Sequence, residues 1–310
     1  MLLLIHSQAK MAKSSVLFIH CSGVSSEVLK NLVLAGIRAV LCDDRPYPSA
    51  MHSTPSFFLS QEDRSTKVAK QTVAEAMRPK IEEINPLLGE CQVCSYAELT
   101  DEFLKGFSIV VCSRLPSQSE AIRLSKGTVA GGGKFYMVDT FGLQGACAFD
   151  LGANHTFRGE KGKELGEARG LKEHIPLDEM LKTPLQDAIN RFHKKPPIQW
   201  IQYKCILEFV ETTKTWPSAA NASVFATTTA AWIAKDSPSL TDHPALTEDS
   251  LQKLAKVATA EVAPVCSVLG GILGNEIIKA ISGKGEPANN TLLLDGTSCK
   301  LWSFLVKPKK

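Results

Sequence analysis

The residues best placed to do chemistry follow the first apolar strand, within the stretch from Val16 to Gly36. This stretch runs from an apolar strand through a tight turn into an amphipathic helix, a layout in which a turn and a helix N-terminus bind phosphates. Such a turn needs glycines, because a Cβ keeps the backbone away from the phosphate. Only Gly23 fits, while His20 and Ser25 occupy positions where glycine is needed. The stretch therefore predicts a nucleotide-binding scaffold whose turn no longer binds phosphate.

Asp44 is the second candidate residue in this region. It lies 21 residues beyond Gly23, at the end of the second apolar strand. An acid at this position can bind a ribose hydroxyl. An isolated acid at a strand end can equally be solvated or cap a loop. We therefore treat Gly23 and Asp44 as vestigial positions of a nucleotide site and assign no catalytic residue.

Two further motifs offer chemistry but favour structural interpretations. Cys91 and Cys94 form a CxxC pair, yet no second pair stands at zinc spacing, and the segment reads as a strand rather than the helix start of a redox site. Residues 131–134, Gly-Gly-Gly-Lys, lack the spacing of a phosphate-binding loop. We read them as a helix-to-strand turn, and we predict no metal site.

The elements that must position these residues alternate between strand and helix in the first half of the chain. Apolar runs predict strands at 15–20, 39–42, 92–94, 108–112 and 134–139. Helices are expected at 24–35, from a cap at Asp63 or Ser65 to about residue 85, and at 118–128. This alternation predicts an α/β fold: a Rossmann-like, doubly wound, mostly parallel sheet with helices on both faces.

The second half is expected to add helices and a closing strand pair. Helical periodicity appears at 200–210, 223–233, 249–257 and from Pro264 onward, and Asp295-Gly296 marks a hairpin turn near the end. A polar stretch at about 154–197 reads as an exposed insertion. We thus expect an N-terminal tail at 1–14 and a single domain at 15–310.

Composition sets limits on the class of protein. The chain has 310 residues, 44% of them hydrophobic, and a net charge of +3, too mild for a nucleic-acid binder. Its nine cysteines show no paired spacing, which indicates reduced thiols. No run approaches the roughly 20 apolar residues of a membrane span. We expect a protein of the nucleus and cytoplasm.

Several segments, in order, resemble the adenylation half of ubiquitin-like modifier activating enzymes, which share the ThiF-type fold. They are KNLVLAGI, FFLSQED with EEINPLL, KFYMVDTFGLQGACAFDLG, and APVCSVLGGILGNEIIKAIS followed by NNTLLLDG, the most specific match. The resemblance covers residues 15–153 and 170–305. The resemblance is strongest to the small, non-catalytic subunits of two-subunit activating enzymes, and above all to those of enzymes that activate SUMO.

The resemblance implies a function shared with a partner. Such enzymes adenylate the C-terminal glycine of a modifier and then capture it as a thioester. The larger subunit holds ATP, magnesium and the catalytic cysteine, so no cofactor is expected on this chain. The implied partners are that larger subunit, with which the chain would form a heterodimer, and a ubiquitin-like modifier, of which SUMO is the first candidate. No binding of nucleic acid or membrane is implied.

The chain departs from the family at the nucleotide-binding positions. His20 and Ser25 replace glycines, and Val68 stands where an arginine is expected. The residues before the first strand contain no arginine that could be lent to the partner, leaving Lys10 or Lys13 as substitutes. These departures imply a divergent member that supports a competent partner.

The late helix carries the predicted partner interface, at Pro264, Gly270, Gly271 and Asn275. Each glycine inside a helix costs about 1 kcal/mol relative to alanine. A close approach of another helix offsets that cost. The sequence leaves open whether that helix belongs to this chain or to a partner.

Three alternatives to this function remain. One is the inactive half of the ubiquitin-activating enzyme or of another modifier's enzyme. The second is a stand-alone ThiF-type adenylyltransferase, and the third is a dinucleotide-dependent oxidoreductase, suggested by Asp44. The last two need a working glycine turn, which this chain lacks.

Overall fold

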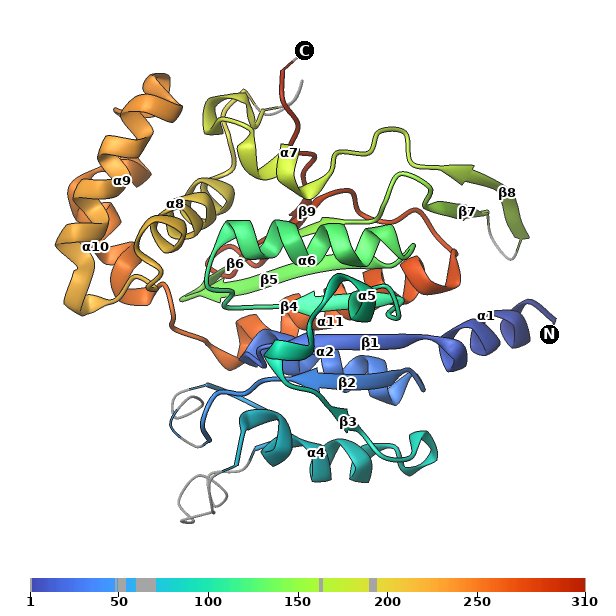
Figure 1. Cartoon of the computed structure of the whole chain (residues 1–310). Helices are drawn as coiled ribbons and strands as arrows, with labels where there is room; N and C mark the ends of the chain where they lie inside the picture. The colour runs from blue at the N-terminus through green and yellow to red at the C-terminus, as the bar shows by residue number, and fades with distance from the viewer. Residues whose placement is uncertain are drawn as a thin grey trace.

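A mixed eight-stranded sheet lies at the centre of the protein (Figure 1). The structure is a computed structural model that describes residues 2–47, 49, 54–59, 71–161, 164–189 and 194–309. The strands in spatial order are β10 (Lys300–Ser303), β9 (Thr291–Asp295), β6 (Gln144–Asp150), β5 (Lys134–Phe141), β4 (Ile109–Cys112), β1 (Ser15–Ile19), β2 (Arg38–Cys42) and β3 (Gln92–Val93).

The five strands from β3 to β5 are parallel, and the other three extend the sheet in antiparallel pairs. The chain builds outward from β1 through β2 to β3, and then crosses to β4 and β5 on the other side of β1. The carboxyl ends of β1 and β4 therefore meet at the point where the strand order reverses, which is where such folds bind ligands. The predicted Rossmann-like sheet and the C-terminal strand pair are both confirmed.

Helices cover both faces of this sheet and create two separate cores. One core lies under α5 (Asp101–Leu104), α6 (Gln118–Ala130), α7 (Leu177–Lys182), α8 (Ile198–Thr213), α9 (Ala222–Asp236) and α10 (Glu248–Val257). The other lies under α2 (Gly23–Leu34), α4 (Val73–Ile84) and α11 (Ala263–Ser282). Successive residues of β1 alternate between the cores, Leu17 entering the first and Phe18 the second.

Local sequence explains where the helices nearest the site begin and end. Ser22 caps α2 in a capping box with Ser25, and Thr72 does the same for α4 with Glu75. After α2 the chain turns at Gly36, whose φ of 84° glycine adopts without steric cost. These caps fix the direction of α2 as it leaves β1.

Two segments hold more regular structure than the sequence suggested. Residues 2–13, expected as a tail, form helix α1 (Leu2–Lys13). Within the polar insertion, β7 (Thr156–Lys161) and β8 (Glu164–Gly170) pair as an antiparallel hairpin apart from the main sheet. The Arg158 N–H donates to Gly283 O at 2.8 Å, so the loop after α11 supports the hairpin.

Among the described residues one helix, α11, is long and apolar enough by composition to cross a membrane, with a mean hydropathy of 1.4. The sequence expectation that no such run exists was therefore wrong. The physical reason is that α11 is a core helix: it packs along α2 and supplies Leu269, Leu273 and Ile277 to the second core.

Short 3₁₀ helices complete the described elements: η2 (Pro86–Leu88), η3 (Tyr96–Glu98), η4 (Leu185–Asp187), η5 (Ala219–Asn221), η6 (Pro238–Leu240) and η7 (Pro244–Leu246).

Candidate functional site

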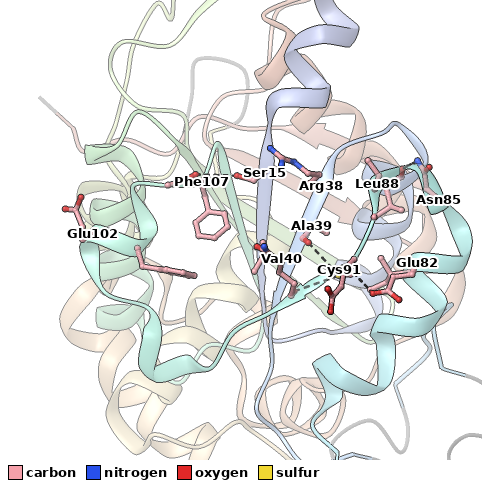
Figure 2. A pocket seen from close by; sticks show the side chains of 17 residues that line it. Ser15, Arg38, Ala39, Val40, Glu82, Asn85, Leu88, Cys91, Glu102 and Phe107 are labelled. Carbon is pink, nitrogen blue, oxygen red and sulfur yellow. Dashed lines mark hydrogen bonds between the residues drawn. The ribbon is translucent and has the colours of Figure 1, made fainter.

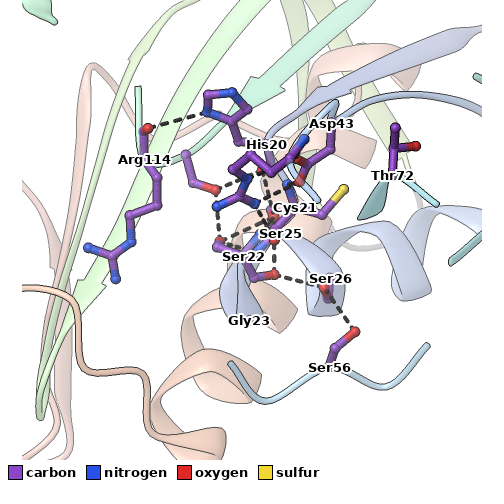
Figure 3. Close-up of polar contacts among 12 residues, drawn as sticks. His20, Cys21, Ser22, Gly23, Ser25, Ser26, Asp43, Ser56, Thr72 and Arg114 are labelled. Carbon is purple, nitrogen blue, oxygen red and sulfur yellow. Dashed lines mark hydrogen bonds and ion pairs between the residues drawn. The ribbon is translucent and has the colours of Figure 1, made fainter. Parts of the chain in front are cut away.

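The turn after β1 keeps the backbone shape of a glycine turn without the glycine. His20 has a φ of 55°, in the left-handed region. This conformation costs an L-residue with a side chain about 1–2 kcal/mol. Arg114, at the end of β4, has a φ of 52°, and its carbonyl oxygen lies 3.3 Å from Nδ1 of His20 (Figure 3). The two strands at the point where the strand order reverses, β1 and β4, are thus both followed by strained turns.

The backbone N–H groups of Ser22, Gly23 and Ser25, at the start of α2, donate to side chains of the chain itself. The Ser22 N–H donates to Ser25 Oγ at 2.7 Å, and the Ser25 N–H donates back to Ser22 Oγ at 3.2 Å. The Gly23 N–H donates to Oε1 of Glu261 at 3.0 Å. The Glu261 side chain is only 4% exposed. A carboxylate of this protein therefore sits where a helix N-terminus would bind a phosphate.

Gly23 itself is required by packing within the chain. A Cβ at this position would lie 2.9 Å from Pro55 O and 3.0 Å from the Cys266 sulfur. The close approach that Gly23 permits is thus to a loop and to α11. The predicted vestigial position is a structural glycine here.

The acid at the end of β2 that faces this turn is Asp43, which is fully buried. Its carboxylate accepts Nε of Arg45 at 2.8 Å, Nη2 of Arg45 at 2.7 Å and the Cys21 N–H at 2.6 Å. Arg45 Nη2 also donates to Cys21 O at 3.1 Å. Asp43 is therefore paired with a cation of the same chain, as the contacts around the turn show (Figure 3).

Asp44, the acid singled out in the sequence, lies elsewhere. It is exposed, and its Oδ2 accepts the Tyr96 N–H at 2.7 Å. The structure thus gives Asp44 the loop-capping position that was the alternative interpretation, and it brings the neighbouring Asp43 to the turn.

Arg114, next to this turn, is held by contacts with several other segments of the chain. Its Nη1 donates to Ala258 O at 2.7 Å and its Nη2 to Thr140 O at 2.8 Å. Its guanidinium lies 3.8 Å from Asp139 and 3.9 Å from Glu261, and it stacks 4.7 Å from the Trp216 ring. The cations of this edge are therefore neutralised by carboxylates of the same chain.

Asp139, in the last part of β5, completes this buried network. Its carboxylate accepts the Arg114 N–H at 2.9 Å and the Tyr203 hydroxyl at 2.8 Å. Burial raises the pKa of Asp139 to about 6, although the Arg114 charge acts in the opposite direction. Within the described part of the chain, no group of three His, Cys, Asp or Glu side chains is placed to hold a metal ion.

The four predicted interface residues divide between two faces of α11. Gly270 faces inward, where a Cβ would lie 2.6 Å from Glu27 Cβ and 2.9 Å from Val24 O of helix α2. Gly271 has no heavy atom within 4 Å of an added Cβ, and Pro264 and Asn275 are exposed. Gly270 thus serves packing within the chain, whereas the other three share the outward face.

Other residues considered in the sequence lie away from the turn after β1. Lys10 donates to Ser282 O at the end of α11. Gly131 ends α6 and Gly132 has a φ of 80°, which confirms a helix-to-strand turn. Val68 lies outside the described residues. A hollow of about 600 Å³ lies at the opposite, amino edge of the strands, where Cys91 and Glu82 line it together with Phe107 (Figure 2).

Sequence reasoning missed Asp43, Arg45, Arg114, Asp139 and Glu261. The Asp-Asp-Arg run at 43–45 offered a signal, because it places a cation within reach of two acids. No sequence signal pointed to Glu261, because this residue lies 238 residues from its hydrogen-bond partner Gly23.

Comparisons with known proteins give a consistent result over nearly the whole chain. No known protein-family model matches it. It is 28% identical to SUMO-activating enzyme subunit 1 of Xenopus tropicalis, over 95% of this chain and 90% of that protein. The chain is a homologue of the SUMO-activating enzyme subunit 1 proteins. Similar values hold for SUMO-activating enzyme subunit 1 of Dictyostelium discoideum, at 26% over 94% of this chain and 86% of that protein.

The plant SUMO-activating enzyme subunit 1B-1 of Arabidopsis thaliana is 28% identical, over 95% of this chain and 89% of that protein. SUMO-activating enzyme subunit 1 proteins from an amphibian, an amoeba and a plant are thus similar to this chain over at least 94% of its length.

Proposed function

We propose that this chain is the small, non-catalytic subunit of a heterodimeric SUMO-activating enzyme, and that ATP and magnesium are held by the larger partner. The observation that carries the proposal is the contact between Glu261 and the Gly23 N–H, at the phosphate position of a nucleotide-binding scaffold. The SUMO-activating enzyme subunit 1 homologues supply the modifier and the pathway.

An ATP molecule would have to displace these internal groups to bind in the usual orientation. Its phosphates would meet the Glu261 carboxylate, which has the same charge, at the helix N-terminus. Its ribose would compete with Arg45 for Asp43. Breaking a buried ion pair costs about 3–5 kcal/mol, because a charge is left without a partner. The geometry therefore supports a subunit that does not bind ATP itself, and it opposes a stand-alone adenylyltransferase.

The outward face of α11 is our proposed contact with the larger subunit. Val268 is half exposed there, and Pro264, Gly271 and Asn275 lie along the same face. Gly271 leaves open space above the helix, so another helix can approach its backbone closely. An apolar side chain next to a small residue is what a helix–helix interface requires.

The experiment compares the chain alone, the larger activating subunit alone, and the two together. SUMO thioester on the larger subunit is measured after addition of ATP and magnesium. Thioester should form only when both chains are present. Adenylate or thioester formation by this chain alone, or full activity of the larger subunit without it, would contradict the proposal.

A charge placed on α11 tests the surface. Val268→Glu should weaken assembly by at least about tenfold, because it buries an unpaired carboxylate in the interface. Val224→Glu on α9 is the matched control, since that valine is also half exposed. Equal assembly of the two variants would exclude the α11 face as the contact.

A further inference from the structure

Cys42 and Cys94 stand opposite each other on neighbouring strands. β2 and β3 are parallel, with Val40 paired to Gln92 and Leu41 paired to Val93. The next pair in the same register is Cys42 with Cys94, and the Cys94 N–H donates to Leu41 O at 2.9 Å. The two cysteines are therefore held by the sheet itself.

The CxxC pair noted in the sequence is split between the two faces of the sheet. Cys94 points into the same core as Cys42, whereas Cys91 belongs to the opposite core. The Cys91 thiol lies 3.6 Å from Ala39 O, beside the hollow at the amino edge (Figure 2). Positions three apart on an extended chain face opposite ways. The thiol nearest Cys94 thus comes from β2.

The spacing of the Cys42–Cys94 pair suits a disulfide. Neighbouring strands run about 4.7–4.9 Å apart, and disulfides bridge Cα atoms about 4.4–6.8 Å apart. The other thiol is the largest influence on the pKa of each cysteine, so the two side chains face each other closely. A bond can therefore form with a local rotation of the side chains.

The two thiols differ in environment. Cys42 is fully buried, and Cys94 is 7% exposed. The neighbouring Cys42 thiol lowers the pKa of Cys94, while burial and the carboxylates of Glu98 and Asp44 act against this. The same contact raises the pKa of Cys42. Cys94 is consequently the thiol that reacts first, and Cys42 is the one that follows.

We propose that Cys42 and Cys94 form an oxidation site that hydrogen peroxide converts into a disulfide. The Cys94 sulfur attacks one peroxide oxygen, the O–O bond breaks, and a sulfenic acid and one water are formed. The Cys42 sulfur then attacks the Cys94 sulfur, the S–O bond breaks, and a second water leaves. The two thiols lose two electrons and two protons, and one peroxide becomes two waters.

This disulfide would lie at the end of β2, beside the contact between Asp43 and Arg45. β3 has only two residues, so few backbone hydrogen bonds join it to β2. Cys42 directly precedes Asp43, the acid that binds Arg45. A covalent link at this point would fix the end of β2 to β3 and close the chain between residues 42 and 94 into a loop.

The test is oxidation of the folded chain by a small excess of hydrogen peroxide, followed by alkylation, trypsin and mass spectrometry. The protein carries Cys299→Ser, because Cys299 is the exposed cysteine that would link two molecules. Tryptic peptides 39–64 and 81–105 should become joined, with the loss of two hydrogens. Joining should be at least about ten times faster than oxidation of the buried Cys112 and Cys147.

Two variants separate the possible bonds. With Cys91→Ser the two peptides should still join, because Cys94 remains. With Cys94→Ser they should not, and circular dichroism and the thermal midpoint establish that this variant is folded. A bond within peptide 81–105, joining that survives Cys94→Ser, or oxidation no faster than that of Cys112 would each overturn the proposal.

Discussion

Glu261 accepts the backbone N–H of Gly23 at 3.0 Å, and so a carboxylate of this chain fills the anion position at the start of α2. The contact joins the loop before α11 to the turn after β1. It converts a potential ligand site into a part of the fold.

Replacing Glu261 should destabilise the protein, and more so when the new side chain has no hydrogen-bond acceptor for the Gly23 N–H. Glu261→Ala leaves the buried Gly23 N–H without its acceptor and removes a neighbour of Arg114, so we expect a loss of about 2 kcal/mol in unfolding free energy. Glu261→Gln keeps an acceptor and should cost about half as much. Urea unfolding measures both. An alanine variant as stable as the parent would show that the contact contributes nothing.

The strained backbone at His20 predicts an unusual ranking of substitutions. His20→Ala and His20→Gly both remove the ring contacts with Tyr96 and Arg114. Only glycine relieves the φ of 55°. His20→Gly should therefore be about 1 kcal/mol more stable than His20→Ala in urea unfolding.

The control for this ranking is Ala230, an exposed residue inside α9. Ala230→Gly should lower stability by about 1 kcal/mol, because glycine disfavours a helix interior. Alanine ranking above glycine at both positions would refute the strain at His20.

Asp139 should make stability depend on pH in the slightly acidic range. Its pKa is about 6 in the folded chain, against an ordinary value of 3.8. Between these values the folded chain binds a proton that the unfolded chain releases, so the unfolding free energy falls as the pH rises from about 4 to 6. The full effect is at most about 3 kcal/mol.

The check is urea unfolding across this pH range for the parent and for Asp139→Asn. The variant has no titrating group at this position, so its stability should lack this component of the slope. Identical pH dependence of the two proteins would contradict the raised pKa of Asp139.

The paired glycines of α11 should respond in opposite directions. Gly270→Ala forces a methyl group to 2.6 Å from Glu27 Cβ and 2.9 Å from Val24 O, and we expect a loss of about 2 kcal/mol in thermal or urea unfolding. Gly271→Ala meets no atom within 4 Å and should gain up to about 1 kcal/mol from helix propensity. Similar effects at both positions would exclude the close α2–α11 contact.

Much of the fold could be predicted from the sequence because short segments of neighbouring residues determine its strands and helices. The apolar runs of β1, β2 and β4 and the caps at Ser22 and Gly36 define a doubly wound sheet without reference to distant residues. The β7–β8 hairpin could not be predicted, because its strands are polar and gain order from backbone bonds to the loop after α11.

The candidate site was predictable only in part. The missing glycines at His20 and Ser25 showed that a phosphate grip was lost. What replaced it could not be read, since Glu261 and Arg114 reach the turn from remote segments. The choice between Asp43 and Asp44 depended on which of two neighbouring side chains points to the turn, and alternation along β2 places Asp43 there.

We propose that this chain keeps a nucleotide-binding scaffold and that its own residues fill the ligand positions. Isothermal titration of the isolated chain with ATP and magnesium tests it most directly. We predict no measurable heat of binding up to millimolar ATP, while the same titration of the chain with its larger subunit gives one site per heterodimer. Micromolar binding of ATP by the isolated chain, lost when Asp43 or Gly23 is changed, would contradict the claim.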